Sequence, residues 1–174
     1  MLDVLADILG DGKASRLYSH LVYDQQVAQD VSASQSGTEL AGTLAIDITA
    51  KPDIPLGTIE RSVDDILQTI MHHGVTEEEV ERSMNNREAQ LVHRLSSTLG
   101  KASGLATSHT LWGNASLYNK ELERFAGISP TDVKDVARKV FTGHHVVLSA
   151  VPKRKTSLAA MPAVALGESK GHKH

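Results

Sequence analysis

The chain contains no cysteine and few aromatic residues. The absence of cysteine excludes disulfide bonds, thiolate zinc sites and cysteine nucleophiles, and it leaves both oxidising and reducing compartments open. Aromatic residues make up only 3% of the 174 residues, and the formal net charge is −3. A surface that stacks bases or binds phosphates through clustered cations is therefore not expected. We expect no nucleic-acid partner.

Long apolar runs are also absent. The uninterrupted apolar stretches are far shorter than the roughly 20 residues needed to span a bilayer, so we expect no membrane span. Residues 1–9 have a helical pattern without a basic start, which is not typical of a signal peptide. With 40% apolar and 22% charged residues, the composition predicts a soluble globular domain with a packed core.

The first third of the chain changes from helical to strand periodicity. Apolar residues at helical spacing predict a helix over residues 2–9, which ends at the turn Gly10-Asp11-Gly12. A second short helix is predicted from about Ala14 to before Val27. Alternation between residues 28 and 49, interrupted at Gly37-Thr38-Glu39, then predicts two strands of an antiparallel hairpin.

The remainder is mainly helical. A helix is predicted to end at His73-Gly74, and the capping box formed by Thr76 and Glu79 predicts that another starts there. This second helix is long and continues to Trp112, with a break near Gly100 or Gly104. Further predicted elements are a short helix over 117–125, a helix beginning at Ser129-Pro130, and a strand from His145 to Val151.

This order predicts an α+β fold in which a mainly antiparallel sheet is backed by helices on one face. The domain covers residues 1–152, and residues 153–174, which show no period, are predicted to be a disordered tail. Three strands make a thin sheet for so much helix. We therefore expect another strand from sequence outside the chain or from a partner.

Several motifs occur in the order found in one known family. The run Asp11–Tyr18 precedes the hairpin motif Val31–Ser34, and Gly74–Arg82 precedes Ile128–Val133. Each motif is common by itself, but their order and spacing over Leu2–Pro152 resemble the C-terminal domain of pitrilysin (insulinase) family zinc metallopeptidases. The resemblance implies a metalloenzyme-type α/β roll that here lacks its first strand. It also implies domains that pair around a peptide-degrading chamber.

The family holds zinc through an inverted motif, H-x-x-E-H, together with a distant glutamate. None of the nine histidines lies four residues from another, so the motif is absent. The nearest pairings at helical spacing are His20 with Asp24 and His73 with Glu77, and a solvated polar face is the favoured interpretation of both. We expect no metal ligands in this chain, and we expect zinc in the N-terminal domain of the parent protein.

The resemblance also points to two positions where family members carry an Arg and a Tyr that bind substrate and stabilise the oxyanion. Val22 and Gln29 occupy these positions. Valine has no charge or donor, and glutamine offers only an amide, so neither suits that role. Arg16 and Tyr18 belong to a run that is structural in the family, and we expect them to pack and form hydrogen bonds. No catalytic or substrate-binding residue is predicted.

Other chemistries have weaker support. The segment Gly10–Ser15 lacks the spacing of a phosphate-binding loop, and a turn is the favoured interpretation. No G-x-S-x-G elbow supports a serine hydrolase. The acidic run Glu77–Glu79 lies where a helix N-terminus favours negative charge, so it is interpreted as helix capping.

The predicted function is that of a non-catalytic C-terminal domain of a zinc metalloendopeptidase. It would pair with a zinc-bearing N-terminal domain or subunit, help to enclose a peptide substrate, and have no activity alone. An exposed sheet edge would also allow a homodimer. The alternatives are a catalytically inactive family member that acts as partner subunit or assembly scaffold, and an unrelated α+β binding module. The resemblance is compatible with a bacterial periplasm or envelope location.

Overall fold

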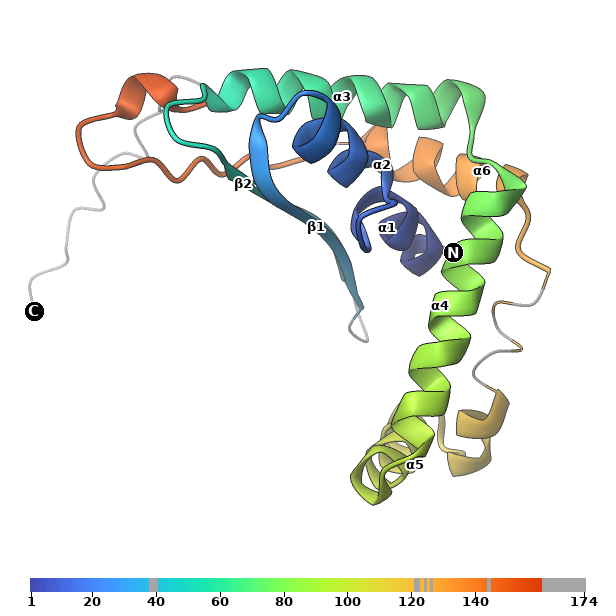
Figure 1. Cartoon of the computed structure of the whole chain (residues 1–174). Helices are drawn as coiled ribbons and strands as arrows, with labels where there is room; N and C mark the ends of the chain where they lie inside the picture. Colours follow the sequence, from blue (N-terminus) through green and yellow to red (C-terminus); the bar gives the residue numbers. More distant parts are fainter. Residues whose placement is uncertain (38–40, 121–122, 124, 126, 144, 161–174) are drawn as a thin grey trace, which may run out of the picture.

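The computed structural model describes residues 1–37, 41–120, 123, 125, 127–143 and 145–160. Helices dominate, and one β-hairpin follows the first three of them (Figure 1). The elements are α1 (Leu2–Gly10), α2 (Arg16–Tyr18), the π-helix η1 (Ser19–Asp24), β1 (Ala28–Gly37), β2 (Gly42–Ala50), α3 (Leu56–His73), α4 (Glu77–Leu95), α5 (Thr98–Trp112), the 3-10 helix η2 (Ala115–Lys120), α6 (Pro130–Phe141) and the 3-10 helix η4 (Thr156–Leu158).

The predicted hairpin is confirmed. β1 and β2 pair antiparallel from Ala28 opposite Ala50 to Gly37 opposite Gly42, with one irregularity next to Gln29. α1 packs against β1, and its last residue is Gly10. A Cβ at Gly10 would lie 2.2 Å from the backbone nitrogen of Ala33, so only glycine allows the helix end to approach the strand this closely.

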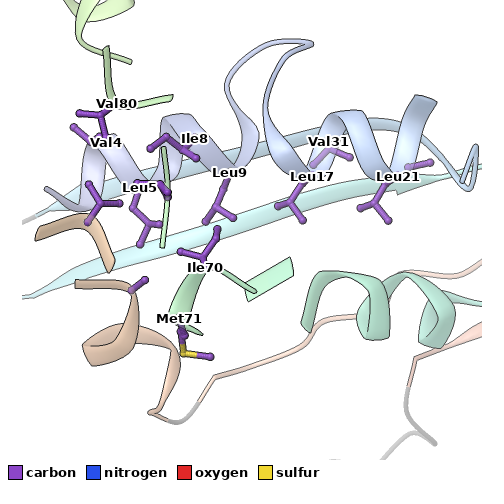
Figure 2. Close-up of a cluster of buried hydrophobic side chains, with 14 of the residues drawn as sticks. Val4, Leu5, Ile8, Leu9, Leu17, Leu21, Val31, Ile70, Met71 and Val80 are labelled. Atoms are coloured by element: carbon purple, nitrogen blue, oxygen red, sulfur yellow. The ribbon is translucent and has the colours of Figure 1, made fainter. Parts of the chain in front are cut away.

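One apolar core joins the helices to the hairpin. In Figure 2 the side chains of Leu5 and Leu9 in α1 point toward Ile70 of α3, as expected from their helical spacing. These three side chains are fully buried, and α6 closes the same cluster. The buried members are Val4, Leu5, Ile8, Leu9, Leu17, Leu21, Ala28, Val31, Ile59, Ile70, Met71, Val75, Val80, Val133 and Ala137. The predicted α+β fold with helices packed on a hairpin is thus present.

Two of the helix starts follow their local signals. Thr76 and Glu79 form the predicted capping box at α4, and Ser129 forms a second one with Asp132 at α6, where Pro130 is the first helical residue. The hydrogen bonds from the Ser129 hydroxyl and backbone hold the pKa of Asp132 below its usual value. Both predicted helix starts are confirmed. They could be predicted from the sequence because capping hydrogen bonds join residues within one turn of the helix.

The helix break predicted near Gly100 or Gly104 lies earlier, between Leu95 and Thr98. The Ser97 hydroxyl accepts a hydrogen bond from the Gly100 nitrogen at 2.9 Å and thereby starts a new helix, α5. Gly104 lies inside α5, and a Cβ there would lie 2.3 Å from the Tyr118 ring, so the lack of a side chain lets this ring approach the helix. The glycines mark a capping contact and a close approach, and neither breaks the helix.

Two predicted elements differ from the structure. The strand from His145 to Val151 is wrong: residues 145–150 form no ladder, and the sheet in the described part of the chain has two strands. Val146 and Leu148 are 95% and 93% exposed, so the segment has the composition of a strand but no neighbour to pair with. The short helix over 117–125 is replaced by the 3-10 helix η2, and Leu122 lies outside the described residues.

The predicted tail begins with ordered contacts. Lys155 forms an ion pair with Asp53, and Ala160 approaches Gly57 at the start of α3. Residues 161–174 lie outside the described residues, so the domain boundary at residue 152 stays a prediction. Within the described segments, no helix combines the length and the apolar character needed to cross a bilayer.

Candidate functional site

The two family positions for substrate binding lie on either side of a turn into the hairpin. Val22 belongs to η1, where its half-buried side chain packs against the core. Gln29 is the exposed extra residue at the irregularity of β1. Valine supplies no hydrogen-bond donor for an oxyanion, and a neutral amide supplies no charge. That these positions take no part in catalysis remains a prediction.

Arg16 connects α2 to the turn between α3 and α4. Its Nε and Nη2 donate to the two carboxylate oxygens of Glu79 at 2.6 and 2.8 Å, and Nη2 also donates to the Gly74 carbonyl at 3.2 Å. Glu79 in turn accepts a hydrogen bond from the Thr76 nitrogen at 2.7 Å. Burial by itself would raise the pKa of Glu79, but the bonds from Arg16 and Thr76 outweigh it and lower that pKa. Arg16 therefore has the kind of structural contact expected for it.

A second ion pair, absent from the sequence-based predictions, joins α1 to α4. The Ser83 hydroxyl donates to one oxygen of Asp7 at 2.6 Å, and Arg87 Nη2 donates to the other at 2.9 Å. The Arg87 guanidinium also lies 4.9 Å from the ring centroid of Phe125. Burial raises the pKa of Asp7 despite the opposing effects of Ser83 and Arg87. The signal in the sequence that could have indicated this ion pair was an acidic residue within the otherwise apolar helix 2–9.

Asp7 is a partly buried acid with a raised pKa, a combination that can mark catalytic chemistry. It lines neither of the two clefts described below. Its two oxygens accept hydrogen bonds from Ser83 and Arg87 of α4, which connects α1 to α4. The geometry is that of a structural contact.

The two His-acid pairings remain two-residue contacts. His20 Nδ1 lies 3.8 Å from an Asp24 carboxylate oxygen, and both side chains are exposed. His73 and Glu77 lie on either side of Gly74, whose φ of 81° ends α3. In the described part of the chain no three His, Asp or Glu side chains come together as a possible metal site. Because a zinc site needs at least three protein ligands, these residues do not fit zinc.

The larger cleft, called the hairpin groove here, lies between β2, α3 and residues 145–149. It has a volume of about 600 Å³. Apolar side chains form most of its wall: Leu44, Ile46 and Ile48 from β2, Val63, Leu67 and Met71 from α3, and Val146, Val147 and Leu148 from the segment after α6. Glu60 and Asp64 also line it, whereas none of the lysines and arginines among the described residues does. The groove can accept an apolar segment with a basic end.

A second cleft of about 510 Å³ lies between α5 and η2, at the far end of α4 (Figure 1). Arg94, Trp112 and Lys120 contribute to its wall. Tyr118 is 6% exposed, and its hydroxyl has no hydrogen-bond partner among the described residues. α4 projects away from the core and carries α5 at its far end (Figure 1). We call α5 and η2 together the arm.

Comparison with protein families identifies the first half of the chain. The model of the family described as "Peptidase M16 inactive domain" matches residues 1–87. An uncharacterized zinc protease of Streptomyces coelicolor is 26% identical over 159 residues, which cover 91% of this chain and 34% of that protein. One of Bacillus subtilis is 25% identical over 151 residues, covering 87% and 37%. The chain thus spans about a third of the length of these curated relatives.

Solved structures share the fold. A protease from Helicobacter pylori superimposes with a TM-score of 0.70 at 21% identity, covering 80% of this chain and 34% of that one. A peptidase M16 inactive domain from Pseudomonas fluorescens gives a TM-score of 0.65 at 15% identity, covering 79% and 32%. The resemblance to the pitrilysin-type C-terminal domain is confirmed, and the chain belongs to the peptidase M16 family as an inactive, C-terminal-type domain of zinc protease-like proteins.

Proposed function

We propose that this chain is the part of a zinc peptidase that pairs with a zinc-bearing domain and helps to enclose the peptide bound there. The observation that carries the proposal is the match of residues 1–87 to the inactive domain of the family, in a chain whose relatives are described as zinc proteases. In the proposal, zinc and its activated water belong to the other domain. This chain supplies a surface that contacts the zinc-bearing domain and part of the wall around the bound peptide.

The positions of the apolar side chains support a role in pairing. On the arm and the adjoining part of α4, large apolar residues are exposed that a monomer would normally bury. Val92 is 61% exposed, Leu99 76%, Leu111 59% and Trp112 48%. Such side chains are typical of the buried centre of a protein interface, with aromatic residues contributing most. The arm is therefore the proposed contact with the zinc-bearing domain.

The proposal is tested by a zinc titration followed by a cleavage assay. The purified chain alone is titrated with zinc by calorimetry and then incubated with an unstructured fluorogenic peptide, with and without a chelator. We expect no stoichiometric zinc binding and no chelator-sensitive cleavage. A His20→Ala variant distinguishes weak binding at the His20–Asp24 pair from a genuine site. Zinc bound at one equivalent, with cleavage by the chain alone, would refute a non-catalytic role.

In the second part of the experiment, the zinc-bearing partner is mixed with this chain at equal concentration in the same cleavage assay. We expect cleavage to rise when this chain is added, and the gain to be lost with Trp112→Ser, whose side chain is half exposed on the arm. Tyr23→Ser is the matched control, because it truncates an aromatic side chain that is 51% exposed and lies in η1, outside the arm. If a complex forms but cleavage is unchanged, the chain is an assembly subunit without a part in enclosing substrate.

A further inference from the structure

The cleft between α5 and η2, called the arm cleft here, has a charge pattern unlike that of the whole chain. Of the described residues that line it, Arg94 and Lys120 are cationic and none is acidic. The stretch from residue 89 to residue 120, which contains the whole arm, carries no aspartate or glutamate, although the chain has a formal net charge of −3. A ligand that enters the arm cleft therefore meets a positive electrostatic potential.

Glu123 is a described acid that approaches this cleft from outside. Its carboxylate oxygen lies 4.0 Å from Lys120 Nζ, and the side chains of Lys120 and Glu123 are 62% and 72% exposed. Such an exposed pair contributes little, because water screens both charges. A carboxylate held at a shorter distance within the cleft can therefore compete with Glu123 for the Lys120 ammonium group.

The strongest indication of a ligand is the hydroxyl of Tyr118, which also lines the cleft. Tyr118 is 6% exposed, and its hydroxyl is buried with no hydrogen-bond partner among the described residues. Native proteins rarely leave a buried hydroxyl unpaired, because the cost of its desolvation is then not compensated by a hydrogen bond. An acceptor bound in the arm cleft would supply the missing bond.

The packing of α5 places the phenol end of Tyr118 at the wall of the cleft. A Cβ at Gly104 would lie 2.3 Å from Cζ of Tyr118, which is the ring atom that carries the hydroxyl. Gly104 and Tyr118 both line the cleft. The close approach therefore holds the unpaired donor against α5, on the side of the helix where the cleft is.

The arm cleft also has the size and the apolar wall of a small-molecule site. Its volume of about 510 Å³ lies within the range of about 300–1,000 Å³ that is typical of such sites. Leu117 and the Trp112 ring contribute apolar surface, while Ser103, Thr107 and Ser108 contribute small side chains. The cleft can therefore hold a short apolar group next to the cations and the Tyr118 hydroxyl.

We propose that the arm cleft binds a carboxylate that is attached to a short apolar group. The Tyr118 hydroxyl donates to a carboxylate oxygen, and Lys120 and Arg94 supply the positive charge. The apolar group contacts Leu117 and Trp112. Such a carboxylate can belong to a free carboxylic acid or to another protein, including the zinc-bearing domain, and the experiments below distinguish these two sources.

The first experiment uses the fluorescence of Trp112, which is the only tryptophan of the chain and lines the cleft. The full chain is titrated with isovalerate and, as matched control, with isovaleramide, which has nearly the same shape but no charge. We expect a saturable change with isovalerate at millimolar concentration and binding of isovaleramide that is at least about fivefold weaker. An equal response to both compounds, or no saturation below about 100 mM, would overturn the proposal.

Two substitutions locate the carboxylate, and circular dichroism checks that each variant is folded. Tyr118→Phe removes only the hydroxyl and should weaken isovalerate binding about tenfold, whereas Tyr23→Phe, on an exposed tyrosine of η1, should not change it. Lys120→Gln should weaken binding and reduce its dependence on salt. Lys101→Gln, exposed on α5 outside the cleft, should change binding by less than about twofold. A folded Tyr118→Phe variant that binds isovalerate as tightly as the wild type would contradict the proposal.

Competition distinguishes the two sources of the carboxylate. The chain is mixed with the zinc-bearing partner, isovalerate is added to saturation, and the complex is measured by sedimentation. Loss of the complex would show that a carboxylate of the partner occupies the cleft, whereas a complex that persists with isovalerate bound would identify a free acid as the ligand. The titrations of the chain alone involve neither zinc nor cleavage, so a failure of the pairing proposed above would not affect their result.

Discussion

The core and the arm bury the same residue types to different degrees. Leu5 and Leu9 of α1 are fully buried, whereas Leu99 and Leu111 of α5 are 76% and 59% exposed. The buried leucines lie in the part matched by the family model, and the exposed ones lie beyond it. The core therefore closes on itself, while the arm presents apolar surface to solvent, which the proposed pairing with a zinc-bearing domain would cover.

The cause is a difference in how the apolar residues are arranged. In α1 they recur on one face and meet α3 and α6. In α5 they are spread around the helix, and the only buried residue is Ser108. When the apolar side chains are spread around a helix, packing against one neighbour buries only some of them. The arm is held instead by local contacts, such as the Ser97 cap and the Tyr118 ring against Gly104.

The largest expected effect is the difference in stability loss when leucine is replaced by alanine in the core and in the arm. Leu5→Ala should lower the free energy of unfolding by about 3 kcal/mol, because it leaves a cavity in a closed core. Leu99→Ala should change it by less than about 0.5 kcal/mol, because that side chain is already in water. Urea unfolding followed by circular dichroism measures both. Similar losses would mean that the arm has its own buried core.

Gly10→Ala tests the contact between α1 and the hairpin. The added Cβ would lie 2.2 Å from the Ala33 nitrogen, so helix and strand must separate, at a cost of about 2 kcal/mol. Gly143→Ala is the matched control, since its nearest atom outside the chain neighbours would lie at 3.7 Å. Thermal unfolding distinguishes them. A stable Gly10→Ala protein would contradict the close approach.

Arg16→Met removes the partner of Glu79 and should cost about 2 kcal/mol at neutral pH. Because the pKa of Glu79 is lowered in the folded state, its contribution is complete above the usual glutamate pKa and is lost as pH falls through the lowered value. The difference between wild type and variant should therefore shrink below about pH 4. Denaturant unfolding across this range measures it.

Two features complete the test of Arg16. The raised pKa of Asp7 has the opposite sign, because protonation of that carboxyl favours the folded state, so the comparison must be a difference between proteins at each pH. Asp53→Asn removes the exposed pair with Lys155 and should cost less than about 0.5 kcal/mol. If the two substitutions cost the same, the Arg16 pair is no more than a surface contact.

Local signals predicted the elements better than their long-range pairing. Capping residues such as Thr76 and Ser129 act within one turn, and alternation in the hairpin sets which side chains face the core, so both could be inferred from sequence. The segment 145–151 has strand composition, but a strand also requires a neighbour that composition does not specify. The pairing of Asp7 with Arg87 joins residues 80 apart, which no local pattern encodes.

The candidate site shows the same limit. The absence of the zinc motif could be seen in the spacing of the histidines, whereas Val22 and Gln29 were singled out only by the resemblance to the family. The hairpin groove could not, because it arises from three segments distant in the sequence, around Ile46, Leu67 and Val147. What the sequence did contain was the mismatch itself, a strand-forming segment in a chain with too few strands. In the structure this strand-forming segment, residues 145–149, forms one wall of the hairpin groove.

The last prediction concerns the buried hydroxyl of Tyr118 in the arm. Tyr118 is 6% exposed and its hydroxyl has no partner among the described residues, so the fold carries its desolvation cost without a hydrogen bond in return. Tyr118→Phe should therefore keep or raise stability, by up to about 1 kcal/mol, whereas Tyr118→Ala should destabilise the arm by leaving a cavity beside Gly104. Hydrogen exchange of α5 amides measures both variants locally. Faster exchange with Tyr118→Phe would mean that the hydroxyl is bound after all, and that the arm is less dependent on an outside partner than its exposed leucines indicate.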